Sequence, residues 1–149
     1  MLIIGCDHGG LNIKLAVIEY LKSKNIPFED VGTHTTDSID YAPIAAKVAH
    51  GVADGTYEKG LLFCGTGIGI SIAANKVKGI RAAVCTDPLC AKLSRLHNNS
   101  NILAMGARIT GRELAKEILK AWLDTEFEGD RHQARIDDIK KIEEGKKLY

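Results

Sequence analysis

The feature that most constrains the fold is a short apolar run, Leu61 to Phe63, which stops at Cys64 and leads into a glycine-rich loop and a helix-like segment. If the run is a strand, Cys64 lies at its carboxyl end, just before a helix N-terminus, where open α/β sheets bind ligands. Backbone N–H groups of the loop at 65–69 can face an anion, and the helix end adds partial positive charge. The same field favours a thiolate over a thiol. The segment therefore predicts a base or nucleophile beside an oxyanion cradle.

Each part of this segment also has a purely structural explanation. A free cysteine is often a small buried apolar residue, and glycines after a strand can simply permit a tight turn. The loop departs from the dinucleotide-binding fingerprint, because the third glycine would have to fall at position 70, and no Walker phosphate loop is present. For Cys64 alone the structural explanation is preferred, whereas Cys64 joined to this loop favours function.

Short apolar runs alternate with amphipathic segments along the whole chain. The predicted strands are residues 2–6, 27–31, 61–64, 80–85 and 102–104. The predicted helices are residues 11–24, 41–53, about 68–77, a segment beginning at Pro88, and 110–123. Thr110 is the expected N-cap of the last of these, since Glu113 completes a capping-box pattern. The alternation predicts an α/β, three-layer Rossmann-like fold, with a five-stranded parallel sheet and helices on both faces.

The final stretch, residues 131–149, differs from the rest. It carries a thin apolar stripe of Ile136, Ile139 and Ile142 within a highly charged segment. Such a helix packs loosely on its own domain or reaches a partner subunit.

Length and composition narrow the function classes. The 149 residues predict a single domain, 1–149, and the hydrophobic and charged fractions of 45% and 26% are ordinary for a soluble protein. A net charge of +1 and few aromatic residues give no reason to expect nucleic acid. With no signal-like or membrane-spanning segment, we expect no membrane association and a cytoplasmic location. The four cysteines form no CxxC pair, so we expect reduced thiols and no metal site.

Polar residues gather where the predicted strands end. Asp7 and His8 follow the first strand, and Arg108 follows the fifth, while His97 and Asn98 precede the fifth. Asp7 and His8 fit an acid/base pair or ligands of substrate hydroxyls, and they fit equally well a helix-capping carboxylate beside a solvated histidine. His97 fits a proton shuttle, although a lone histidine at a helix C-terminus is more often a favourable charge on the helix dipole.

Three arginines are candidates for binding phosphate, because a guanidinium matches phosphate oxygens with a fork of donors. They are Arg108, Arg131 and Arg135, and the last two share one helical face at i, i+4 spacing. Any one of them alone is more simply explained as a solvated surface residue.

Together, these segments resemble ribose-5-phosphate isomerases of the B type, in a family that also includes galactose-6-phosphate isomerase subunits. The matching pieces extend over nearly the whole chain, and the longest is also the most specific. They are Gly5–Gly10, Asp40-Tyr41, Cys64–Lys76, Gly79–Ala82, Ser94–Asn98, Gly106–Arg108 and Arg131–Arg135. The resemblance implies a Rossmann-like fold, a homodimer or a dimer of dimers with sites at the subunit interface, and no metal or organic cofactor.

The resemblance further implies interconversion of D-ribose 5-phosphate and D-ribulose 5-phosphate, the sugar-phosphate chemistry of the pentose phosphate pathway. Cys64 stands where the family has its cysteine base. Another branch of the family uses a glutamate where this chain has Ile70, so the cysteine branch is indicated. His97 with Asn98 would assist opening of the sugar ring, and Asp7 and Tyr41 would contact its oxygens.

The remaining roles implied by the resemblance concern the reaction intermediate and the phosphate. Thr66 and the loop N–H groups of Gly65, Gly67, Ile68 and Gly69 would steady the intermediate. The phosphate would be held by His8 and Arg108, joined by Arg131, His132 and Arg135 from the second subunit. One departure is visible, because the family often has Asp-Tyr-Pro where this chain has Tyr41-Ala42-Pro43.

Three rival interpretations remain open. The same scaffold could isomerise a six-carbon sugar phosphate such as allose 6-phosphate or galactose 6-phosphate. The glycine loop could belong to a non-catalytic module that binds a nucleotide or sugar phosphate. A thiol redox protein is the third, although the missing CxxC argues against it.

Overall fold

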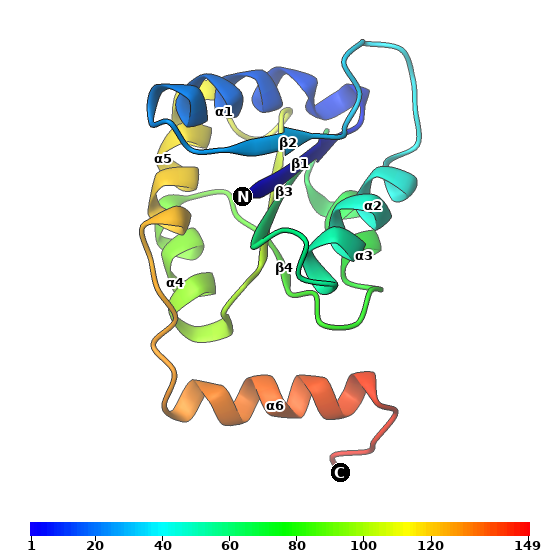
Figure 1. Cartoon of the computed structure of the whole chain (residues 1–149), viewed down its shortest axis with the longest axis vertical. Coiled ribbons are helices and arrows are strands. Elements are labelled where there is room, and N and C mark those ends of the chain that lie inside the picture. The colour runs from blue at the N-terminus through cyan, green and yellow to red at the C-terminus, as the bar shows by residue number, and fades with distance from the viewer.

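The computed structural model describes all 149 residues and is built around one parallel sheet (Figure 1). The five strands lie in the order β2-β1-β3-β5-β4, with every neighbouring pair parallel. They are β1 (Leu2–Cys6), β2 (Phe28–Asp30), β3 (Lys59–Cys64), β4 (Ala82–Val84) and β5 (Ile102–Gly106). The central strands β1 and β5 are buried along their whole length, and β3 nearly so. Their continuous apolar sequences are typical of parallel strands that are covered on both faces.

Helices cover both faces of the sheet, as the sequence predicts. One face carries α1 (Leu11–Ser23), α4 (Pro88–Asn98) and α5 (Arg112–Leu123), and the other carries α2 (Tyr41–Ala53) and α3 (Ile68–Ala74). A short 3₁₀ helix, η1 (His8–Gly10), leads from β1 into α1. None of the helices is both long enough and apolar enough to cross a lipid bilayer.

Alternate residues of each central strand supply two separate apolar cores. On β3, Leu61 and Phe63 point toward the layer of α1, α4 and α5, while Leu62 and Cys64 point toward α2 and α3. Trp122 is the largest fully buried side chain and belongs to the first core. Cys64 therefore ends β3 on the face that α2 and α3 cover.

The predicted capping box at the start of the last sheet-packing helix is wrong. Helix α5 begins at Arg112 with Gly111 as its N-cap, and no side chain caps it. The backbone N–H of Thr110 donates to the Gly106 carbonyl at 2.9 Å, so Thr110 belongs to the turn that leaves β5. Helix α3 also ends earlier than predicted, because the Asn75 side chain bonds both backbone groups of Ala82 instead of continuing the helix.

The last helix, α6 (Arg131–Glu143), lies apart from the other elements (Figure 1). His132 is its only buried residue, and Ile139 and Ile142 are exposed. Its far end is tied to the loop before β4, because the Glu143 carboxylate accepts the Gly79 backbone N–H at 3.0 Å. The predicted C-terminal helix is thus present, and its contact with a partner remains a prediction.

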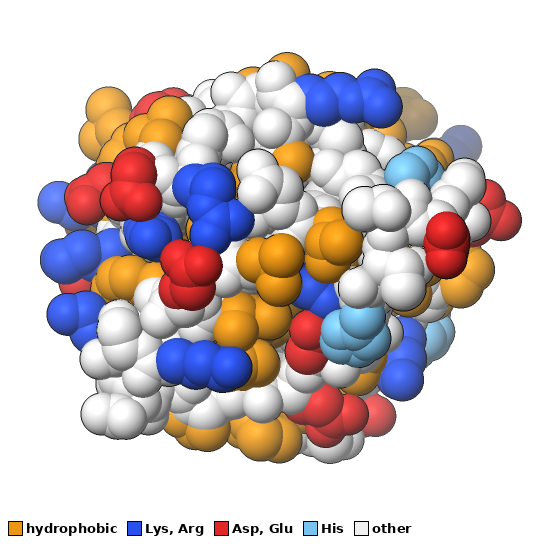
Figure 2. Space-filling view, turned by 90° about the horizontal axis from the view of Figure 1, so that it is seen from above, with side chains coloured by type: hydrophobic (Ala, Val, Ile, Leu, Met, Phe, Trp, Pro, Cys, Tyr) orange, Lys and Arg blue, Asp and Glu red, His pale blue; other side chains and the backbone are white.

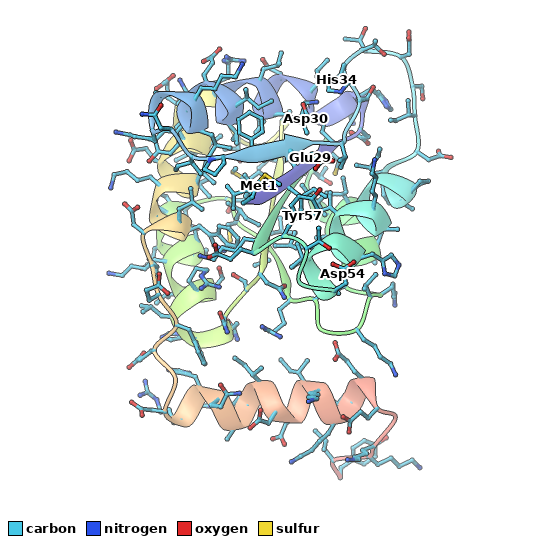
Figure 3. The ribbon with its side chains drawn as sticks, in the orientation of Figure 1. Met1, Glu29, Asp30, His34, Asp54 and Tyr57 are labelled. Atoms are coloured by element: carbon cyan, nitrogen blue, oxygen red, sulfur yellow. The ribbon has the colours of Figure 1, made fainter.

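A buried ion pair links α1 to the end of β2. The Lys14 ammonium lies 2.8 Å from one Asp30 carboxylate oxygen, and it donates to the Thr33 carbonyl at 2.6 Å. The Lys14 side chain is only 1% exposed. Figure 3 shows Asp30 at the end of β2, beside Glu29 and close to His34. Since a buried ammonium is costly without its counter-charge, this pair constrains the chain after β2.

Replacing Asp30 by Asn should destabilise the fold by roughly 3–5 kcal/mol, because it leaves the Lys14 charge buried without a counter-charge. Urea denaturation measures the change. Glu29→Gln is the control, since the neighbouring Glu29 is exposed and accepts a hydrogen bond only from the Tyr57 hydroxyl. Adding Lys14→Met to Asp30→Asn should recover much of the loss. Equal stability of Asp30→Asn and the wild type would contradict this account.

Candidate active site

The carboxyl ends of β1, β3 and β5 meet at a small cavity. Its volume is about 210 Å³. The residues that line it are Asp7, His8, Gly9, Tyr41, Cys64, Gly65, Thr66, Gly69 and Arg108. Much of the predicted site is thus brought together by one chain, at the sheet edge where parallel α/β folds place ligands.

The thiol of Cys64 is held by the glycine loop. Its Sγ accepts the backbone N–H of Gly67 at 3.0 Å, and Cys64 is only 4% exposed. Gly67 has φ +79°, a left-handed conformation that glycine adopts without strain, and it is the residue before α3. A hydrogen bond from an N–H group to sulfur is strongest when the sulfur is a thiolate. The loop therefore provides a backbone donor to the sulfur of Cys64, which lines the cavity.

Close backbone contacts fix the loop around Cys64. A Cβ added to Gly106 would lie 2.2 Å from the Thr66 carbonyl carbon, and one added to Gly10 would lie 2.3 Å from the Phe63 carbonyl carbon. The hydroxyl of Thr66 in turn accepts the Ile68 N–H at 3.2 Å. Two glycines on neighbouring segments thus allow the cavity wall to form.

Asp7 and His8 line the cavity and also support the local backbone. The Asp7 carboxylate accepts the Gly10 N–H at 3.1 Å and so caps η1, as the structural explanation of this residue predicts. Nδ1 of His8 accepts the Ile39 N–H at 3.2 Å. A neutral His8 ring with an accepting Nδ1 carries its proton on Nε2, which makes Nε2 a donor. Arg108 is exposed at the rim, so the cavity has two donor side chains suited to an anion.

The other predicted residues lie elsewhere in this chain. His97 lies in the last turn of α4, and its ring stacks on the His132 ring with centroids 4.4 Å apart. Nη1 of Arg135 lies 3.2 Å from Nδ1 of His132. We call His97, His132 and Arg135 the histidine cluster. Neither it nor its neighbours Asn98 and Arg131 line the cavity around Cys64.

Burial keeps His132 neutral. Its side chain is 5% exposed, and burial, with the nearby Arg131 charge, lowers its pKa below the usual value. Glu128, which the sequence does not single out, lies beside it with Oε2 3.4 Å from Nε2 of His132. Ligand-capable atoms of His97, Glu128 and His132 all lie within 4.8 Å of one another. Nothing in the sequence around Glu128 signals this grouping.

The other cysteines at strand ends do not provide a second reactive thiol beside Cys64. Cys6 and Cys85 belong to the core on the opposite face of the sheet. Burial raises the pKa of each thiol to about 11, so both are protonated near neutral pH. The structure thus gives no support to the redox interpretation, which needs a second reactive thiol near Cys64.

Surface charge gives no sign of a polyanion-binding face on the side shown in Figure 2. Lys and Arg side chains alternate there with Asp and Glu, and apolar side chains lie between them. The cavity at the sheet edge, in contrast, combines Arg108 and His8 with the backbone of the glycine loop. Fold and site together define a Rossmann-like α/β protein that can hold a small anionic molecule beside a cysteine.

Comparison with known proteins identifies the family. The model of the ribose/galactose isomerase family matches residues 2–139. The chain is 49% identical over 140 residues to ribose-5-phosphate isomerase B of Escherichia coli, covering 94% of each chain. It is 43% identical over 137 residues to D-erythrulose-4-phosphate isomerase of Pectobacterium atrosepticum, covering 91% of this chain and 90% of the relative. Ribose-5-phosphate isomerase B of Clostridium thermocellum has the same fold, with a TM-score of 0.95 at 49% identity, covering 97% of this chain and 99% of the other. The chain therefore belongs to the ribose/galactose isomerase family.

A methyl group at Gly106 should disturb the cavity, because it would collide with the Thr66 backbone, which cannot rotate away. Gly106→Ala is expected to lower stability in urea by about 1–3 kcal/mol and to change the rate at which Cys64 is alkylated. Gly111→Ala is the control for the alkylation rate, since a Cβ there meets nothing within 4 Å, and any loss of stability there comes from the N-cap of α5. If Cys64 is alkylated at the same rate in both variants, the close contact does not position the loop.

Proposed function

We propose that this protein interconverts D-ribose 5-phosphate and D-ribulose 5-phosphate through a cis-enediolate. The observation that carries the proposal is the Cys64 thiol, which accepts the Gly67 N–H at 3.0 Å inside a cavity with donors for an anion. The similarity to ribose-5-phosphate isomerase B of Escherichia coli, at 49% identity, supports this choice of substrate.

The proposed reaction moves one proton between C1 and C2 of the open-chain sugar. The Cys64 thiolate takes the proton from the carbon beside the carbonyl, and the C–H electron pair forms the C1–C2 double bond of an enediolate. The same thiol returns the proton to the neighbouring carbon, and in the enediolate the hydroxyl proton passes between O1 and O2, so that the carbonyl moves from one carbon to the other. In our proposal the loop N–H groups at Gly65 and Gly69, with the Thr66 hydroxyl, stabilise negative charge on the enediolate oxygens, while the Gly67 N–H stays bonded to Cys64 Sγ. Losing one such donor costs about 3 kcal/mol of barrier in other enzymes.

The phosphate would lie at the outer end of the cavity. Arg108 and Nε2 of His8 are donors that suit its oxygens, and both line the cavity. Asp7 and Tyr41 lie between this end and Cys64 in our proposal and contact the sugar oxygens. Phosphate binding would then hold the reacting carbons at the thiol, so part of its binding energy appears in the rate.

Ring opening would require a group from a second copy of the chain. We assign His97, with Asn98, to protonation of the ring oxygen, yet His97 lies outside the cavity of its own chain. Because His97 stacks on His132, and Arg135 adjoins His132, the histidine cluster would enter a partner's cavity as a unit, with Arg131 beside it. Ile68, Ile72 and Ile109 are exposed apolar residues near the cavity-forming loops, as expected of a surface that a second copy covers. The proposed assembly is a homodimer with shared sites.

A different sugar phosphate is the main competing substrate. A relative 43% identical to this chain is named D-erythrulose-4-phosphate isomerase, so chain length of the sugar varies among relatives of this similarity. A panel of four-, five- and six-carbon sugar phosphates, including allose 6-phosphate and galactose 6-phosphate, decides the preference. A non-catalytic binding module would instead bind without turnover and tolerate Cys64→Ser.

Cys64→Ala should lower kcat for ribose 5-phosphate by roughly 10²–10⁴-fold, the usual contribution of a general base, with little change in KM. The assay measures ribulose 5-phosphate formation without added metal. Cys90→Ala is the matched control, because Cys90 is exposed on α4 and does not line the cavity. Near-normal turnover by Cys64→Ala would rule out the thiolate base.

Mixing two inactive variants tests the shared site. Cys64→Ala and His97→Ala should each be inactive alone, and subunit exchange should restore activity, because a mixed dimer has one site with both residues. About a quarter of wild-type turnover is expected, since about half of the dimers are mixed and each has one complete site. No recovery, with exchange verified by mass spectrometry of differently labelled subunits, would place Cys64 and His97 of one site on the same chain.

A further inference from the structure

The segment before α6 brings a carboxylate to the histidine cluster. The backbone N–H of Glu128 donates to the Leu96 carbonyl at 3.1 Å, which holds Glu128 beside the last turn of α4, where His97 lies. The chain then turns sharply, and the His132 N–H donates to the Gly129 carbonyl at 2.9 Å. Backbone hydrogen bonds thus fix the two segments that carry His97, Glu128 and His132.

One polar atom in this group has no hydrogen-bond partner. Nε2 of His132 is buried and unpaired, although Oε2 of Glu128 lies only 3.4 Å away. The side chain that carries it is 5% exposed. Buried ring nitrogens are normally hydrogen-bonded, so an unpaired one that faces a carboxylate and a second imidazole needs an explanation.

We propose that His97, Glu128 and His132 form an inhibitory binding site for a divalent transition-metal ion of the zinc class. Two imidazole nitrogens and one carboxylate oxygen are ligands that Zn²⁺ accepts, and a fourth position is left for water. Tetrahedral zinc with ligand bonds of about 2.0–2.1 Å separates its ligand atoms by about 3.4 Å. The present atoms lie within 4.8 Å of one another, and Nε2 of His132 and Oε2 of Glu128 are already 3.4 Å apart. The half-buried His97 ring has to rotate out of its stack on His132 to bring a nitrogen to the same ion. Glu128 is exposed, and its Oε1 lies 3.7 Å from Nη1 of Arg131, an exposed ion pair that metal binding would loosen.

Metal binding would displace Arg135. At present Nη1 of Arg135 can donate to Nδ1 of His132, so the proton of the neutral ring is on Nε2. When Nε2 binds a metal, that proton moves to Nδ1, which can no longer accept from a guanidinium. Arg135 is exposed and turns away. The inhibitory effect rests on the proposed function, in which His97, His132 and Arg135 act on the substrate. A bound metal would occupy both histidines and move Arg135 away from the substrate phosphate.

Isothermal titration calorimetry of the protein with zinc chloride tests the site and requires no enzyme activity. We expect one zinc ion per chain. The visible absorption spectrum of Co²⁺ bound in place of zinc reports the coordination geometry of the ion. Glu128→Gln should bind zinc at least about 10-fold more weakly, since even an outer-shell partner contributes that much. Glu126→Gln is the matched control, an exposed acid two residues away that is outside the group. No binding by the wild type, or equal binding by Glu128→Gln, overturns the proposal.

Inhibition of isomerisation is the second readout. Zinc should inhibit the wild type and Glu126→Gln reversibly, with recovery on adding EDTA. Glu128→Gln should keep the basal activity and require at least about 10-fold more zinc for the same inhibition. Equal inhibition of this variant would assign the effect to another group, such as Cys64, and overturn the proposal. Cys64→Ala should still bind zinc, so loss of the proposed isomerase function leaves the calorimetric test intact.

Discussion

The register of β3 between β1 and β5 determines where the groups of the cavity lie. Parallel pairing aligns Cys6 with Phe63 and Cys64 with Gly106, so the three strands end within one residue of the same level. The segments that follow these strands then lie against one another with no room for a side chain between their backbones. Gly10 and Gly106 make this possible, because each allows one backbone to lie against another where a methyl group would not fit. The position of the Cys64 thiol is therefore a property of the sheet and not of a flexible loop.

Much of the fold follows from local sequence pattern. Strands that are buried on both faces have continuous apolar sequences, and the segments between them have apolar residues at helical spacing. The number of strands, the order of the helices and the parallel direction of the strands could therefore be predicted. Local pattern failed where a turn after a strand competes with it. Thr110 and Glu113 match a capping box, yet the N–H of Thr110 is already bound to the Gly106 carbonyl, which shifts the helix start to Arg112. Sequence pattern contains no information about that competing bond.

The candidate site was predictable only in part, and for a related reason. Asp7 and Arg108 follow strands and Cys64 ends one, and parallel topology alone gathers such residues at one edge. His97 and His132 belong to different helices whose packing is set by few contacts, so their stacking could not be derived from spacing. Glu128 enters the same group through a backbone hydrogen bond to Leu96, which involves no side-chain identity.

The sparse attachment of α6 has a consequence for motion. This helix buries one residue against its own chain, whereas the sheet buries whole strands. Local opening of α6 therefore costs much less free energy than opening of β1, β3 or β5, and the helix can adjust its position while the sheet stays intact. The sheet thus holds the thiol in a fixed position, whereas the weakly attached helix α6, which carries His132 and Arg135, can move. The fixed and the movable groups of the proposed site thus belong to separate elements of one short polypeptide.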